Sequence, residues 1–139
     1  MTPRFRAWYT PFKGKTIGQE MKYGQAGRLI TYAEMAPDKY MLMQSTTLKD
    51  KNGVEIFEGD IALITHKSTN YADTYWHSYV EVFRAENGAY RIRGEHIYET
   101  ELYSSRKQLT VAGNIYNSPE LLKRDRFMTT TENPELLGG

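Results

Sequence analysis

The sequence predicts a mostly β fold, built from one or two small open, SH3-like β-barrel units with a short C-terminal helix. Aromatic residues make up 13% of the 139 residues, 11 of them tyrosines, and aromatic side chains favour strands. Asn-Gly pairs stand at 52–53 and 87–88, and both residue types tolerate the positive φ that tight hairpin loops require. The apolar runs beside these pairs are short and β-branched, as is typical of strands.

The chain length indicates one domain. A chain of 139 residues can bury one real core but not two large ones. We assign residues 1–127 to a single compact β-rich domain, with residues 1–45 as an alternative N-terminal subdomain. Residues 128–139, which end in two glycines, are expected to form a flexible tail.

Composition and charge exclude several classes of function. The sequence contains no cysteine, which rules out disulfides, thiol catalysis and cysteine-ligated zinc. No run is apolar and long enough for a secretory signal or a membrane span, so we expect no membrane contact. The net charge is +1, without the basic excess typical of proteins that bind nucleic acid through phosphates. Nucleic acid is therefore a disfavoured partner.

The N-terminal part is expected to contain three strands. Phe5–Tyr9 is the first, and it stops before Pro11 because proline removes a hydrogen-bond donor. Glycines interrupt residues 13–27, which predicts a loop or a weak hairpin. Further strands are expected over residues 28–35 and 40–44.

The centre of the chain holds two turns. Asn52-Gly53 predicts either a two-residue hairpin loop or a type I turn closed by a left-handed glycine. Gly59 and Asp60 form the second turn, and the apolar run 61–64 that follows is predicted to be a strand. We expect Asp60 to hydrogen-bond backbone amides where this strand begins.

A second hairpin is predicted around Asn87-Gly88. If its loop has two residues, Arg84 lies directly opposite Arg91, and Arg93 follows on the same face. Like charges in this arrangement repel each other unless a negative group lies near.

Two interpretations of this arginine face stay open. In the simpler one, Glu81, Glu95 or Glu99 neutralises the arginines, or the side chains extend into water. In the other, the face contacts an anion or nucleic acid, and neighbouring aromatic side chains stack on bases. The residues of that candidate site are Arg84, Arg91, Arg93, Tyr71, Tyr75 and Trp76. Such aromatics are also typical of a core strand or a subunit interface.

The C-terminal part is expected to close the fold. Residues 97–103 are predicted to be a strand or a short helix, and residues 109–116 a closing strand. Ser118 and Pro119 are a favourable N-cap and first residue for a short helix.

One segment resembles a phosphate-binding loop without matching it. Gly14-Lys15-Thr16 has the ending of that motif, but the first glycine of the motif is missing. Pro11 and Gly18 stand where the motif needs a strand and a helix. We interpret this segment as an ordinary turn.

No other group of residues predicts catalysis or metal binding. His66, His77 and His96 lack a local metal-ligand spacing. Glu58 and Asp60 flank a turn glycine, where acids usually form turns rather than catalytic pairs. We therefore expect a protein that is not an enzyme, with no catalytic residue, no cofactor and no metal.

Several segments resemble the YopX-like proteins of phages and prophages. Met43-Gln44, then Thr47–Gly53, then Ile56–Ile61 is similar to the signature of that family. Pro3–Trp8 is similar to its opening and Gly113–Leu122 to its close. Ser45-Thr46 departs from the family pattern. The resemblance implies a mostly β fold of small barrel-like units and a phage-encoded protein, and it supplies no catalytic residues.

We hypothesise a non-catalytic phage or prophage accessory protein in the cytoplasm of a bacterial host. It would act through contacts with an unknown protein partner or through self-assembly as a homo-oligomer. The alternative is a weak nucleic-acid-binding module that uses the basic, aromatic-flanked hairpin face.

Overall fold

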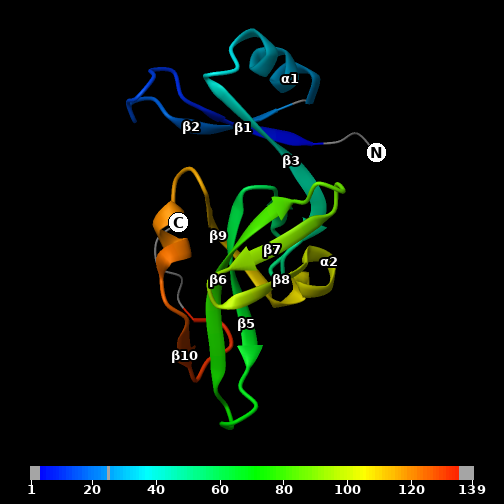
Figure 1. The fold of residues 1–139 in the computed structure, drawn as a ribbon, viewed down its shortest axis with the longest axis vertical. Helices are drawn as coiled ribbons and strands as arrows, with labels where there is room; N and C mark the ends of the chain where they lie inside the picture. Colours follow the sequence, from blue (N-terminus) through cyan, green and yellow to red (C-terminus); the bar gives the residue numbers. More distant parts are fainter. Residues whose placement is uncertain (1–3, 25, 135–139) are drawn as a thin grey trace. The chain divides into compact units, whose positions relative to one another are not determined.

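The computed structural model describes residues 4–24 and 26–134 and confirms a mostly β fold (Figure 1). The chain divides into two compact units, Met1–Thr47 and Leu48–Gly139. β3 (Tyr40–Lys49) contains the boundary between the units, which are described in turn.

Unit 1 is a small antiparallel sheet with one helix. It contains β1 (Phe5–Tyr9), β2 (Glu20–Gly24), α1 (Ala26–Met35) and the first part of β3 (Tyr40–Lys49). β1 is central, because it pairs antiparallel with β2 on one edge and with β3 on the other. The predicted first strand is confirmed, and residues 20–24 form the second arm of a hairpin.

Residues 28–35 were predicted to be a strand, and that prediction is wrong, because they lie in α1. The segment mixes β-branched residues with strong helix formers. The Thr31 hydroxyl donates to the Gly27 carbonyl at 2.8 Å, and the Ala36 amide donates to the Tyr32 carbonyl at 2.9 Å. Leu29 is buried, so tertiary packing of one helix face outweighs the local preference of Ile30 and Thr31.

Unit 2 is a curled half-barrel sheet with the order β8-β7-β6-β5-β9, and β10 pairs with β6 (Figure 1). A separate four-stranded sheet has the order β2-β1-β3-β4, so β4 is hydrogen-bonded to β3. The strands are β4 (Glu55–Phe57), β5 (Asp60–Lys67), β6 (Tyr75–Arg84), β7 (Tyr90–Gly94), β8 (Ile97–Glu101), β9 (Leu109–Asn114) and β10 (Phe127–Thr129). The short helices are α2 (Leu102–Ser105), η1 (Arg106–Gln108) and η2 (Pro119–Lys123).

β5 is buried on both faces. Ala62 and Ile64 pack into one apolar cluster with residues of β6, β7, β9 and α2. Ile61 and Leu63 point the other way, into a second cluster that includes Leu121 of η2. Successive side chains of a strand point to opposite faces, so an uninterrupted apolar run is what a strand between two clusters requires.

The Asn52-Gly53 turn is the second of the two predicted types. Its loop has three residues, because the Asp50 amide donates to the Val54 carbonyl at 2.9 Å and Gly53 adopts φ +81°. The Asp50 carboxylate is buried and accepts the amides of Asn52 and Val54 through Oδ1, at 2.8 and 2.9 Å. Its Oδ2 accepts the Val111 amide of β9 at 2.9 Å. One side chain thus joins the turn to the closing strand.

The Gly59-Asp60 turn is also held by backbone amides. Asp60 Oδ2 accepts the Phe57 amide at 2.8 Å, which confirms the predicted role of Asp60. The Gly59 amide donates to the Val82 carbonyl at 2.8 Å, and its carbonyl accepts the Ile115 amide at 2.9 Å. The turn therefore connects β6 to the end of β9.

The predicted register of the β6–β7 hairpin is wrong by one residue. Gly88 adopts φ +87° and closes a three-residue loop, so that the Ala85 amide donates to the Ala89 carbonyl at 2.8 Å. Arg84 consequently pairs with Tyr90, not with Arg91. A shift of one residue moves every side chain of one strand to the other face.

The C-terminal predictions have mixed outcomes. Residues 97–103 are first strand β8 and then the start of α2, so both alternatives occur in succession. The strand over 109–116 is confirmed as β9, and a short helix follows Ser118. In the segment expected as a tail, residues 128 and 129 belong to β10, while 135–139 lie outside the described residues.

Asp50→Ala is expected to lower the free energy of unfolding by about 3 kcal/mol, because three amides lose a charged acceptor in a buried position. The exposed turn residue Glu86 offers a matched control, and Glu86→Ala should stay within about 0.5 kcal/mol. Urea denaturation of both variants measures the difference. Equal stability of the two would contradict this role of Asp50.

Candidate functional site

Two of the three arginines of the predicted hairpin site are ion-paired within the sheet. Arg91 Nε lies 2.9 Å from Glu99 Oε2, and Arg93 Nε lies 3.3 Å from Glu81 Oε1. The Arg93 guanidinium also lies 4.0 Å from the centre of the Phe83 ring. The simpler interpretation of these two arginines therefore holds, with Glu81 and Glu99 as the partners.

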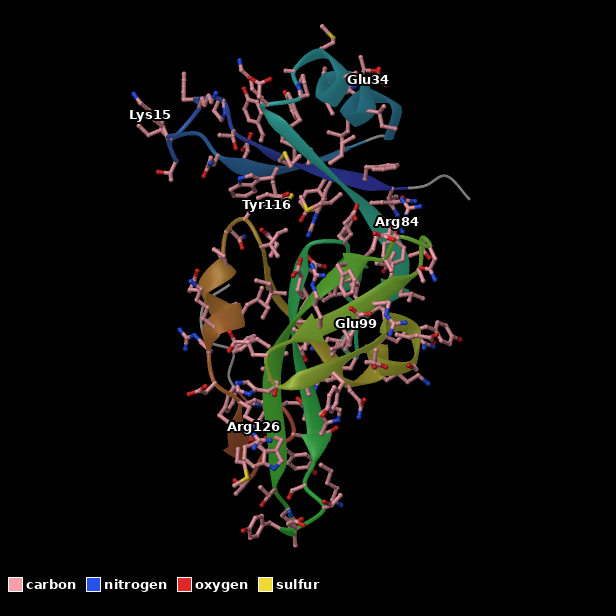
Figure 2. All side chains as sticks on the ribbon, viewed as in Figure 1. Lys15, Glu34, Arg84, Glu99, Tyr116 and Arg126 are labelled. Atoms are coloured by element: carbon pink, nitrogen blue, oxygen red, sulfur yellow. The ribbon has the colours of Figure 1, made fainter. Side chains whose placement is uncertain are left out.

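Arg84 is separate from the other two arginines. It lies near the tip of the β6–β7 hairpin, whereas Glu99 lies on β8 (Figure 2). The observed register puts Arg84 on the sheet face opposite to that of Arg91 and Arg93. Among the residues described, Glu95 pairs with neither Arg91 nor Arg93.

The three aromatic residues of the predicted site lie at the other end of β6. Tyr75 and Trp76 begin the strand that Arg84 ends, and nine residues of extended chain span about 30 Å. Tyr75 and Trp76 are adjacent in the strand and point to opposite faces. Tyr71 is 62% exposed in the loop between β5 and β6. The predicted site is therefore split.

The end of β6 that lies far from Arg84, here called the distal end, carries a partly exposed strip of side chains. β7 pairs with residues 81–84 only, and β5 and β6 run past it as a long hairpin (Figure 1). On the face that carries the first apolar cluster, His66, Trp76 and Met128 stand in register across β5, β6 and β10. We call these three residues the distal strip. Met128 is 44% exposed, and the Arg126 guanidinium lies 4.4 Å from the centre of the Trp76 ring.

The opposite face at the same end holds a buried histidine. His77 Nδ1 lies 2.9 Å from Thr65 Oγ1, and His77 Nε2 lies 2.7 Å from Thr129 Oγ1. The ring stacks on Phe127 with centroids 5.0 Å apart. Burial, with a smaller contribution from the positive charge of Lys51, lowers the pKa of His77 below its ordinary value. These contacts give His77 a structural role between three strands.

The other two histidines have different neighbours. His66 Nδ1 lies 3.4 Å from Gln108 Nε2, and His96 Nε2 lies 3.6 Å from Asp125 Oδ1. Within residues 4–24 and 26–134, no group of three or more His, Asp or Glu side chains is arranged to hold a metal ion. In the same ranges, none of the helices combines the length and apolar character needed to cross a bilayer.

Beside His77 lies a cavity of about 280 Å³ that is lined by three lysines. We call it the lysine pocket. Lys51 comes from the Asn52-Gly53 turn, Lys67 from the end of β5 and Lys107 from η1. Sequence reasoning missed this site, because the three lysines are far apart along the chain and no local spacing connects them. The Lys51 amide, which donates to the Leu109 carbonyl at 3.1 Å, shows how the fold brings two of the segments together.

The chain is similar to known proteins at the level of a family model and of solved structures. The family model described as YopX protein matches residues 4–123. The chain is 28% identical to protein EF1440 from Enterococcus faecalis, whose crystal structure superposes with a TM-score of 0.50. That match covers 88% of this chain and 99% of the other. No curated protein matches the chain.

Lowering the pH is expected to destabilise the fold through His77. Because the pKa of His77 is lowered in the folded protein from 6.5, the unfolded chain binds more protons below that pH. Stability is therefore full above the unfolded pKa and is lost as the pH falls from about 6.5 toward the folded pKa. The measurement is the free energy of unfolding as a function of pH, which His77→Gln should make less steep.

His66→Gln is the control for this experiment, because His66 is only half-buried. Its profile should keep the steepness of the unmodified protein. A His77→Gln profile as steep as that of the unmodified protein would show that another group causes the pH dependence.

Proposed function

The chain belongs to the YopX family, and we propose that it is a non-catalytic accessory protein of a phage or prophage that acts through contacts with other protein molecules. The resemblance noted in the sequence is confirmed by the family match over residues 4–123. A second copy of the same chain is the first partner that we propose, because a surface of its own sheet is left partly exposed.

The distal strip is the observation that carries this proposal. In the middle of the sheet, Val80 and Val82 on this face are fully buried in the first apolar cluster. Farther along the same strand, Trp76 is only half-buried, and Met128 beside it is 44% exposed. Tryptophan and methionine are enriched in protein–protein interfaces, as is arginine, here supplied by Arg126. This face of the sheet is buried in the middle and partly exposed at one end. A partner molecule could cover the exposed end and bury its apolar side chains.

The buried polar side chains at the centre of the fold form structural hydrogen bonds, which supports a role without catalysis. The carboxylates of Asp50 and Asp60 accept backbone amides in turns, and His77 contacts two threonine hydroxyls. A general acid or base needs a free approach to a substrate proton. The acids and the histidine at the centre of the fold are instead parts of its scaffold.

A nucleic-acid-binding role is the alternative, and the ion pairs of the hairpin weigh against its original site. The guanidinium groups of Arg91 and Arg93 already face Glu99 and Glu81. An approaching phosphate would have to displace a carboxylate at each position, and the carboxylates would repel it.

The double variant Arg91→Ala/Arg93→Ala is therefore expected to leave retention of single-stranded DNA unchanged at low salt. The physical reason is that each change removes a cation already neutralised by a neighbouring acid. A filter-binding titration at two salt concentrations measures retention. Salt-dependent retention that disappears in the variant would favour the alternative function.

If the protein self-associates through the distal strip, substitutions in the strip should lower its average molecular mass in solution. Trp76→Lys/Met128→Lys should weaken the oligomer about tenfold or more, because two charges enter an interface that must exclude water. Light scattering over a dilution series measures the mass. Tyr98→Lys is the matched control, since Tyr98 is 96% exposed on β8 and should leave the mass unchanged.

Two results would contradict the proposal of self-association. One is a monomer at all concentrations of the unmodified protein. The other is an oligomer that the Trp76→Lys/Met128→Lys variant leaves intact while its thermal unfolding remains cooperative.

A further inference from the structure

The lysine pocket lies at the same end of the sheet as His77 and is built from five segments of unit 2. Lys51 follows Asp50, whose carboxylate joins the turn to β9. Lys67 ends β5, and Lys107 lies in η1 between α2 and β9. Glu132 reaches the cavity from the segment after β10. The position of each lysine is thus set by the hydrogen-bonded frame and not by a free loop.

The charges in this cavity are unbalanced. Three lysines and one glutamate are among the residues that line it, and none of the three lysines forms an ion pair with any residue that the structure describes. The arginines of the β6–β7 hairpin show the opposite arrangement, since Arg91 and Arg93 each have a carboxylate. Cations gathered in a cavity without an equal number of anions repel each other, and a bound anion relieves that repulsion.

Neutral polar groups complete the lining. They are Thr65, Tyr75 and Gln108. The Thr65 hydroxyl is held at 2.9 Å from His77 Nδ1, and the Gln108 amide lies 3.4 Å from His66 Nδ1. The single hydroxyl hydrogen of Thr65 is donated to His77 Nδ1, because His77 Nε2–H donates to Thr129 Oγ1, whose own hydrogen goes to the Thr131 carbonyl. The Gln108 amide and the Tyr75 hydroxyl are the neutral groups of the lining that can donate to a phosphate oxygen. The lining therefore combines charge with hydrogen-bond donors.

The size of the cavity limits the ligand. A volume of about 280 Å³ lies just below the range of about 300–1,000 Å³ that drug-sized ligands fill. Single-stranded nucleic acid is usually bound along an extended groove with stacked bases, whereas this cavity is compact and bears a carboxylate. A small anion fits it better than a polymer backbone does.

We propose that the lysine pocket binds the phosphate group of a small phosphorylated molecule. Lys51, Lys67 and Lys107 supply the positive charge, and Tyr75 lines the same cavity. Glu132 lowers the affinity, because its carboxylate competes with the phosphate for the ammonium groups. The residues that β5 and β6 contribute to this pocket, Thr65, Lys67 and Tyr75, lie on the face opposite to the distal strip, and the inference does not depend on self-association.

The test is an NMR titration of the full chain with inorganic phosphate and with glycerol 3-phosphate, at constant ionic strength set by chloride. We expect saturable shifts of the backbone amides of Thr65, Lys67 and Gln108. Lys67→Ala and Lys107→Ala should each weaken binding about tenfold, because each removes one charge-assisted hydrogen bond. Glu132→Gln should strengthen it severalfold.

Two controls separate binding in the pocket from general charge effects. Lys13→Ala removes an exposed lysine of unit 1 and should leave the affinity unchanged. Thermal unfolding and light scattering of the lysine variants should match those of the unmodified protein, which keeps this result distinct from the outcome for the distal strip.

Three results would overturn the proposal. The first is the absence of saturable shifts up to about 50 mM phosphate, the range of very weak binding. The second is binding that Lys67→Ala, Lys107→Ala and Glu132→Gln all leave unchanged. The third is a single-stranded oligonucleotide that produces the same shifts at much lower concentration, since the pocket would then serve a nucleic-acid backbone.

Discussion

The carboxylate of Asp50 is the contact on which unit 2 depends most. It accepts three backbone amides, two within its own turn and one from Val111, which is 61 positions farther along the chain. A buried carboxylate is costly unless its oxygens are hydrogen-bonded, and here the turn and the closing strand supply the donors. The Asn52-Gly53 turn thereby gains a fixed position against β9, and Lys51 is placed beside the end of β5. The same carboxylate therefore stabilises the local turn and holds the distant strand β9 against it.

The unequal lengths of the strands produce both proposed surfaces. β5 and β6 are long enough to extend past β7, and β10 covers only one edge of the extension. On one face of this extension the apolar side of the sheet is left open as the distal strip. On the other face, His77 and the threonines on either side of it form a polar floor next to the lysine pocket. The middle of the sheet, by contrast, is covered on both faces and serves stability.

Much of the fold could be predicted from the sequence, because turn residues and apolar runs act locally. The Asn-Gly pairs, the Gly59-Asp60 turn and the short helix after Ser118 all lie where residue chemistry places them. The error at the β6–β7 hairpin has a simple cause. Asn87-Gly88 is compatible with two-residue and three-residue loops, and the left-handed conformation of Gly88 selects the longer one. Helix α1 was missed because burial of Leu29 is a tertiary effect.

The candidate sites were less predictable than the fold. The arginine face was predicted from an assumed register. The observed register differs by one residue and puts Arg84 on the opposite face from Arg91 and Arg93. Glu81 and Glu99, which pair with Arg93 and Arg91, were among the expected partners. Tyr75 and Trp76 were expected to flank the arginine face, but they lie at the opposite end of β6, and their division between two faces required the observed pairing. The lysine pocket joins residues that have no sequence relation. Only the closure of the sheet brings them together.

Amide hydrogen exchange at Val111 tests the central role of Asp50 most directly. If the Asp50 carboxylate holds β9 in place, the Val111 amide exchanges only when the whole of unit 2 unfolds, with the same free energy as the core amides of β5. An Asp50→Asn variant should lower the protection of Val111, Asn52 and Val54 together. Rapid exchange at Val111 in the unmodified protein, while the amides of β5 stay protected, would contradict the account.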